Sequence, residues 1–196
     1  MSAGAAQMQA LIVIGAVLLL ALFWMVVNFN RFARLRQNIR ESWSDVDVEL
    51  KRRYELIPNL VATVRGYAAH ERAVLEEVTA LRNRALASQG SAPSQAADET
   101  AMLLGLRKLF AVVEAYPALK ADRQFLALQK ELALTEDRIA AARRFFNGNV
   151  REMRNLRESF PTSVVGSAMR IEEPTFFEIE DANERVVPRV DLGTGR

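Results

Sequence analysis

Hydrophobic and polar positions divide the chain into two unlike parts. From Ala10 to Phe29 every residue except Asn28 is apolar, and the first charged side chain is Arg31. Such a run spans roughly 30 Å as a helix, which is the thickness of the hydrocarbon core of a bilayer. It is longer than the apolar part of a signal peptide, no charge precedes it, and no small-residue cleavage site follows it. The pattern therefore predicts an uncleaved transmembrane helix over residues 10–30.

The charges beside this run predict its orientation. Segment 1–9 carries no charged side chain, whereas four arginines come before the first acidic residue, Glu41. The positive-inside rule then places residues 1–9 outside and everything after residue 30 on the cytoplasmic side of the membrane. At helical spacing the arginines surround the helix, which suits contact with lipid headgroups on all sides. The expected headgroup contacts are Arg31, Arg34, Arg36 and Arg40.

Beyond Arg31, apolar residues recur at steps of three and four, which is typical of helices with one buried face. The predicted helices cover about 31–56, 59–87, 98–116 and 120–160, and a Ser-, Gly- and Pro-containing loop covers 88–99. Pro58 has no N–H for the carbonyl of Tyr54, so a kink or turn is expected there, with Asn59 near the start of the next helix. The fold class is therefore all-α. The transmembrane helix is expected to continue into an antiparallel four-helix bundle over residues 31–161.

Residues 162–196 lack this spacing and contain Pro174 and Pro188, so they are predicted to form an irregular tail. Two possibilities remain open for its apolar pair, Phe176 and Phe177. They could pin the tail to a groove, or the tail could be largely mobile.

Several motifs closely resemble those of the bacterial LemA family. They are the runs from Trp43 to Glu71, Glu114 to Ala121 and Phe125 to Asn147, and the pair Phe160-Pro161. The resemblance covers residues 29 to 165; Phe146 stands where the family often has Tyr, and the chain after Ser167 has no match. It implies a single N-terminal membrane helix and a four-helix bundle on the cytoplasmic side, and it implies no activity.

Composition removes several kinds of chemistry. The chain has no cysteine and one histidine, which excludes disulfides, thiolate nucleophiles and cysteine-bound metals. His70-Glu71 is followed by Val74 where a zinc protease motif needs a second histidine, and a di-iron bundle site needs two histidines. No nucleophile elbow or phosphate-binding glycine loop is present. We predict no catalytic residue, cofactor or metal; a carboxylate metal site remains as an alternative, formed by Glu71, Glu114 and Glu131.

The motifs that carry this resemblance contain both structural residues and a candidate interaction surface. The structural residues are Trp43, Pro58, Tyr116 and Pro117. The candidate surface consists of Lys51, Arg52, Arg53, Asn59, Tyr67, His70 and Glu71. The alternative for its basic residues is a solvated face paired with nearby acids.

These observations favour a non-enzymatic, membrane-anchored scaffold or adaptor that assembles as a homo-oligomer. The small residues Gly15, Ala16 and Ala21 would permit close approach of two membrane helices. A net charge of +2 is too small to indicate nucleic-acid binding. The expected partners are the lipid bilayer, further copies of the chain and a membrane protein. Two alternatives are an accessory subunit of a membrane protease or envelope-maintenance complex, and a protein that binds metal or lipid.

Overall fold

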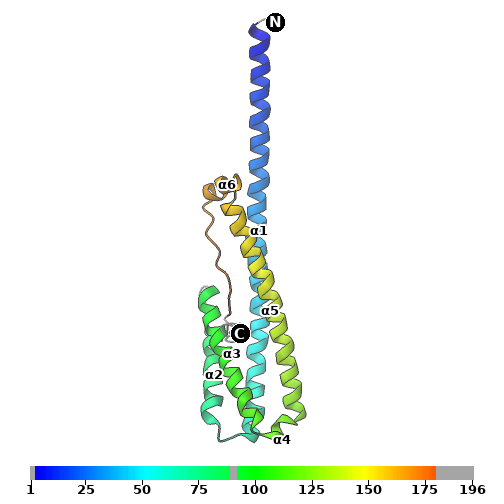
Figure 1. Cartoon of the computed structure of the whole chain (residues 1–196), viewed down its shortest axis with the longest axis vertical. Helices are drawn as coiled ribbons and strands as arrows, with labels where there is room; N and C mark the ends of the chain where they lie inside the picture. The colour runs from blue at the N-terminus through cyan, green and yellow to red at the C-terminus, as the bar shows by residue number, and fades with distance from the viewer. Residues whose placement is uncertain (1–2, 89–91, 180–196) are drawn as a thin grey trace, which may run out of the picture. The chain divides into compact units, whose positions relative to one another are not determined.

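The computed structural model describes residues 3–88 and 92–179, and every regular element in that part of the chain is a helix (Figure 1). The helices are α1 (Ala3–Tyr67), α2 (Arg72–Ala87), α3 (Ala92–Glu114), α4 (Pro117–Lys120), α5 (Arg123–Glu158) and α6 (Thr162–Ala168). The all-α prediction is confirmed, as is the continuation of the apolar N-terminal helix into the helical core.

The chain divides into two compact units. Unit 1 contains residues 1–44 and 144–174, and unit 2 contains residues 45–143 and 175–196. Each of the two longest helices, α1 and α5, contributes residues to both units.

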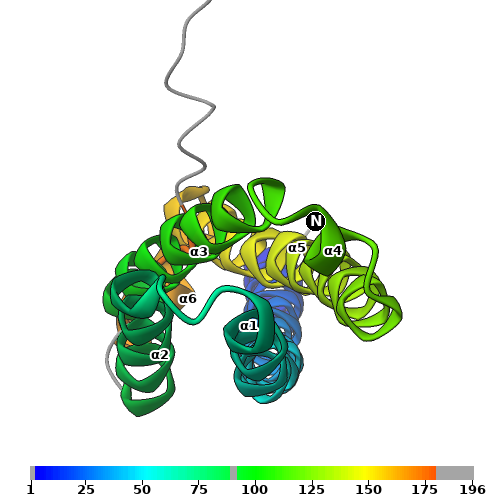
Figure 2. The ribbon, with the colours of Figure 1, turned by 90° about the horizontal axis from the view of Figure 1, so that it is seen from below.

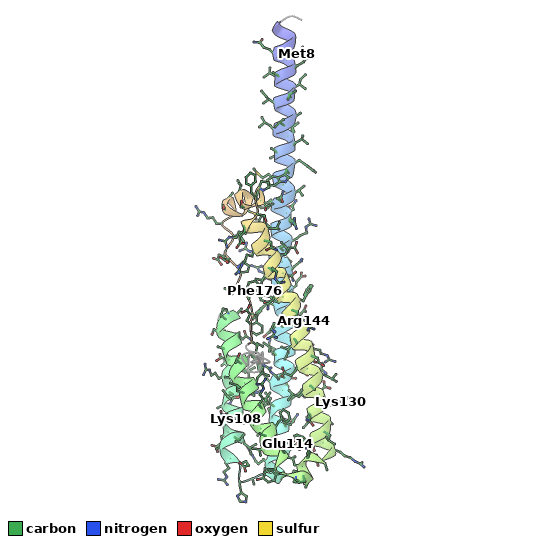
Figure 3. All side chains as sticks on the ribbon, viewed as in Figure 1. Met8, Lys108, Glu114, Lys130, Arg144 and Phe176 are labelled. Carbon is green, nitrogen blue, oxygen red and sulfur yellow. The ribbon has the colours of Figure 1, made fainter. Side chains whose placement is uncertain are left out.

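The apolar start of α1 belongs to unit 1, and its side chains are exposed on every side. In Figure 3 the side chains of this stretch project outward all around the helix, with Met8 near its beginning. The side chains of Leu11, Leu19 and Phe23, for example, are 70%, 69% and 68% exposed. Helix α1 is the one described helix long and apolar enough to cross a membrane. An apolar surface of this length, without any protein cover, indicates membrane anchoring.

Directly after the apolar stretch, unit 1 has a small core of its own. Phe32 and Leu35 of α1 pack against Met153 and Leu156 of α5 and Val165 of α6. Figure 1 shows α6 beside α1 at this level. The end of α6 is closed by two backbone hydrogen bonds, Arg170 N to Ser167 O and Ile171 N to Gly166 O, with Arg170 in the left-handed region at φ 47°. This is the Schellman arrangement that commonly ends a helix.

Unit 2 is the helical bundle. Parts of α1 and α5 lie with α2, α3 and α4 around one core, as the view along the bundle shows (Figure 2). Its buried residues recur at helical spacing in the longer helices, for example Leu60 and Val64 in α1, Leu75 and Val78 in α2, and Leu106 and Leu109 in α3. Short connections join successive helices, so neighbouring helices run antiparallel.

Pro58 does not end a helix, and the predicted turn at this position is wrong. Helix α1 runs through Pro58 to Tyr67, and the turn to α2 comes at residues 68–71. The missing proline N–H leaves the carbonyl of Tyr54 without its helical partner. Arg82 of α2 supplies the replacement, since its Nε donates to Tyr54 O at 3.1 Å. Asn59 is therefore an exposed residue inside α1 rather than a helix start.

Two further boundaries differ from the predictions. Helix α3 begins at Ala92, six residues before the predicted start at 98, and it buries Gln95, Ala96 and Glu99 there. The predicted irregular tail begins with α6, because Val165 and Gly166 have a core to pack against. Residues 169–179 are without helix, and Phe177 in that segment is fully buried, which confirms the pinned alternative for this residue. Residues 180–196 of the predicted tail lie outside the described residues.

Candidate functional site

The most unusual feature of unit 2 is a buried ion cluster, which we define as Arg53, Glu99 and Glu136. The side chains of Arg53 and Glu99 are 0% exposed, and that of Glu136 is 32% exposed. Arg53 Nη2 contacts Glu99 Oε2, and Arg53 Nη1 donates to Glu136 Oε1 and Oε2 at 3.0 and 3.1 Å. One guanidinium therefore joins α1, α3 and α5.

Arg53 suits this position because its rigid guanidinium presents several donors at once. Burial of an ion pair costs several kcal/mol of desolvation per ion, which the mutual attraction offsets only when the geometry is good. Arg53 Nε has no hydrogen-bond partner within the described residues, which adds to that cost. The cluster thus joins three helices without a large expected gain in net stability.

Neighbouring polar groups extend the buried ion cluster. The hydroxyl of Tyr54 donates to Glu99 Oε1, and burial of the ring raises the pKa of Tyr54 above its usual value of 10.0. Asp98, one residue before Glu99, pairs with Arg84 of α2 at 2.6 Å and is largely buried. All four long helices therefore contribute to this polar layer.

The cluster corrects one part of the sequence interpretation. Arg53 was expected on an exposed interaction surface, and that expectation is wrong because the side chain is fully buried. Its carboxylate partners were not recognised. A signal was available, since Arg53 lies three residues after Leu50 and Glu99 three before Met102, each within a buried stripe. Opposite charges on two such stripes indicate a buried pair.

Several motif residues meet at one end of unit 2, where the α1–α2 turn lies beside α4 (Figure 1). We call them the bundle-end cluster: Tyr67, Glu71, Tyr116 and Asp122. Tyr67 OH donates to Asp122 Oδ2 at 2.9 Å, and Tyr116 OH donates to Glu71 Oε1 at 3.3 Å. Pro117 occupies the first position of α4, where its lack of an N–H costs nothing. The motif at residues 114–121 and the turn after α1 are thus linked by tyrosine–carboxylate hydrogen bonds.

The bundle-end cluster changes the acidity of its members. Backbone N–H donation from Phe125 at 2.8 Å, followed by the Tyr67 hydroxyl, lowers the pKa of Asp122 from 3.8. The same hydrogen bond raises the pKa of Tyr67 above 10.0. The pKa of Tyr116 is raised first by desolvation and then by the charge of Glu71. Each phenol is therefore held neutral and each serves as a donor.

Asp122 yields a pH-dependent prediction. Its carboxylate caps α5 three residues ahead of Phe125, and its folded pKa lies below the unfolded value of 3.8. Its stabilisation is therefore complete above about pH 4 and is lost as pH falls through the lower folded pKa. Asp122→Ala should lower the melting temperature by a few degrees at pH 7 and flatten the melting profile in acid. Asp122→Asn keeps a hydrogen-bond acceptor, so its melting temperature should fall less at pH 7, while its dependence on pH in acid should be equally flat. The account would be contradicted if the melting temperatures of all three proteins fell in the same way as the pH is lowered.

The remaining residues of the candidate surface are exposed or paired. Lys51 pairs with Asp47 at 2.6 Å and Arg52 pairs with Glu131 at 2.5 Å, both as exposed ion pairs. His70 is exposed in the turn after α1. The structure thus brings Tyr67, His70 and Glu71 to one end of unit 2, while Lys51 and Arg52 lie further back along α1.

In unit 1, the four juxtamembrane arginines are all exposed, and Arg31 also pairs with Glu152 of α5 at 3.2 Å. Trp43 packs as predicted between helices, with its ring 5.1 Å from that of Phe146 in α5.

The alternative carboxylate metal site is not assembled in the structure. Glu114 pairs with Lys120 at 2.5 Å, Glu131 pairs with Arg52, and Glu71 accepts from Tyr116. Across residues 3–88 and 92–179, no three metal-binding side chains come together.

Taken together, the fold and these clusters define an all-α bundle protein with one candidate membrane anchor. The chain belongs to the LemA family, whose sequence pattern it matches over residues 42–192, so the expectation that the match ends near Ser167 is wrong. It is also distantly similar to magnetosome protein MamQ of Magnetospirillum gryphiswaldense, with 24% identity over 172 residues, covering 74% of this chain and 63% of that protein. Magnetosome protein MamQ 2 of Paramagnetospirillum magneticum is 25% identical over 170 residues, with 74% and 62% covered. The chain thus spans less than two thirds of the length of these relatives.

Proposed function

We propose that this LemA family protein is a non-enzymatic scaffold, anchored by α1 at the inner face of the bacterial cytoplasmic membrane and assembled as a homo-oligomer. One observation carries the proposal. Helix α1 contains both an exposed apolar stretch of membrane-spanning length and the buried residues Leu50, Ile57 and Leu60 of the unit 2 core. The anchor and the bundle therefore share one element, which suits a protein that presents a folded surface at a membrane.

The orientation follows from charge. Arg31, Arg34, Arg36 and Arg40 are exposed directly after the apolar stretch, where the positive-inside rule favours the cytoplasmic side. The distant relatives are named as magnetosome proteins, and the proposal takes from them no more than this name.

Self-assembly is proposed to involve the small residues of the anchor. A Cβ atom added at Gly15 would meet nothing within 4 Å in the single chain. Gly15 is therefore not needed for packing within the chain, while a glycine flanked by Ala16 allows two membrane helices to approach closely.

Crosslinking in native membranes, followed by mass measurement in mild detergent, tests this proposal. We expect an oligomer for the unmodified chain and a reduced oligomer fraction for Gly15→Leu. Leu18→Ile, on the same exposed stretch, is the matched control and should assemble normally. A chain that is monomeric under both conditions would contradict the scaffold proposal. Stoichiometric recovery of such a monomer with a membrane protease would favour the accessory-subunit alternative.

A further inference from the structure

Unit 1 exposes an apolar tip at the connection between α5 and α6. We define the apolar tip as Phe160, Pro161, Val164 and Ala168, all of which are exposed. Phe160 is 86% exposed, the largest value among the large hydrophobic residues of unit 1 outside α1. Val164 and Phe145 follow, each 61% exposed. No charged side chain occurs between Glu158 and Arg170. A contiguous exposed apolar patch with a polar rim marks a site of protein or membrane interaction.

The height of the apolar tip along α1 can be estimated from contacts within unit 1. Helix α6 packs on α1 through Val165 against Phe32, and a Cβ added at Gly166 would lie 3.2 Å from Phe32 Cζ. Phe32 follows the last residue of the apolar run, Phe29, by three residues, or about 4.5 Å along the helix axis. The headgroup layer on each side of a bilayer is roughly 5–7 Å thick. Helix α6 therefore lies at the depth of the headgroups.

Charge in unit 1 favours a lipid surface there. Residues 1–44 and 144–174 contain nine arginines and five glutamates, whereas the whole chain has a net charge of only +2. The excess positive charge therefore lies in the unit that carries the anchor. Arg170 follows the tip closely along the chain and is exposed. Arg31 and Arg34 are also exposed, and they flank Phe32, which shares a buried cluster with Val165 of α6. Basic residues near a membrane surface attract anionic lipids, at about 1 kcal/mol each.

From this placement we infer that the apolar tip is a second membrane contact, in which Phe160 and Val164 insert into the boundary between headgroups and acyl chains. Aromatic and aliphatic side chains on one exposed face, flanked by basic residues, are what interfacial segments present to lipid. The inference rests on the anchoring part of the proposed function and is independent of self-assembly. It gives unit 1 two attachments to the bilayer, one spanning it and one lying at its surface.

The absence of cysteine makes a direct test possible, because each introduced cysteine is the single labelling site. Full-length Phe160→Cys and Val164→Cys are labelled with an environment-sensitive fluorophore and reconstituted into vesicles containing phosphatidylglycerol. Phe145→Cys, an aromatic residue of α5 in the same unit and 61% exposed, is the matched control. Leu20→Cys, 68% exposed within the apolar run, reports on the anchor itself. Quenching is measured with doxyl-labelled lipid from the membrane side and with iodide from the aqueous side.

We expect labels at residues 160 and 164 to be quenched by doxyl lipid, and to be several-fold less sensitive to iodide than the label at residue 145. Equal iodide sensitivity at residues 160 and 145 would overturn the inference while leaving the anchor intact, provided the label at residue 20 is quenched by doxyl lipid. Protection from iodide without doxyl quenching would mean that protein covers the tip, which also overturns it. Failure of doxyl quenching at residue 20 would overturn the anchoring and the inference together.

Discussion

Arg53→Met is expected to destabilise unit 2 by about 3–5 kcal/mol, the usual cost of breaking a buried ion pair from one side. The substitution leaves the fully buried carboxylate of Glu99 without its cation, while Glu136 keeps its access to solvent. Chemical denaturation followed by circular dichroism measures the loss as a lower midpoint. Because unfolding of a chain with two compact units can occur in steps, the transition of unit 2 should be the one that shifts.

Two further variants determine whether the buried charge causes this loss. In the double variant Arg53→Met with Glu99→Gln, the residue at position 99 is neutral and can still accept from Tyr54, so a large part of the stability should return. Lys51→Met removes a cation from the exposed pair with Asp47 two residues away, and should cost at most about 1 kcal/mol. A loss for Lys51→Met as large as that for Arg53→Met would refute the explanation.

Leu19→Arg combined with Leu20→Arg is expected to abolish stable membrane insertion. Each arginine at the centre of a spanning helix costs about 2.5–3.5 kcal/mol of insertion free energy, while each apolar residue contributes only a few tenths. The two together offset most of what the exposed apolar stretch provides. Alkaline carbonate extraction measures the result: the unmodified chain should stay in the membrane pellet, and the variant should appear in the supernatant.

Val48→Arg is the matched control for this experiment. Val48 is 58% exposed and belongs to the same helix, but it lies well beyond the apolar stretch in unit 2. The variant should remain in the pellet like the unmodified chain. Retention of the double-arginine variant in the pellet would show that α1 is not the element that anchors the protein.

Periodicity and length were sufficient to predict the helical class, the apolar anchor and most of the core. The steps of three and four in the apolar pattern predict one buried face that includes Phe32, Leu35, Leu50 and Ile57, and all four are buried. These predictions succeed because each depends on residues close in sequence. The beginning of α6 was missed for the opposite reason, since its few apolar residues become a helix only against Phe32, more than a hundred residues earlier in the chain.

The candidate site was predicted less well than the fold. The motifs single out Tyr67, Glu71 and Tyr116 of the bundle-end cluster. They do not single out Asp122, although an acidic residue three positions before Phe125 is typical of a helix cap. Arg53 was identified and assigned to the wrong environment, because adjacent charges at residues 51–53 suggested a solvated face. Only the structure shows that Glu99 and Glu136 lie beside it.

The bond from Arg82 to the carbonyl of Tyr54 has a consequence for how the bundle assembles. Before α2 docks, the segment of α1 around Pro58 lacks that bond and its carbonyl must bind water. Docking of α2 therefore completes the hydrogen bonding of α1 at the one turn that its own backbone leaves open at Pro58. The two helices are coupled through this carbonyl, so formation of α1 through Pro58 and attachment of α2 favour each other.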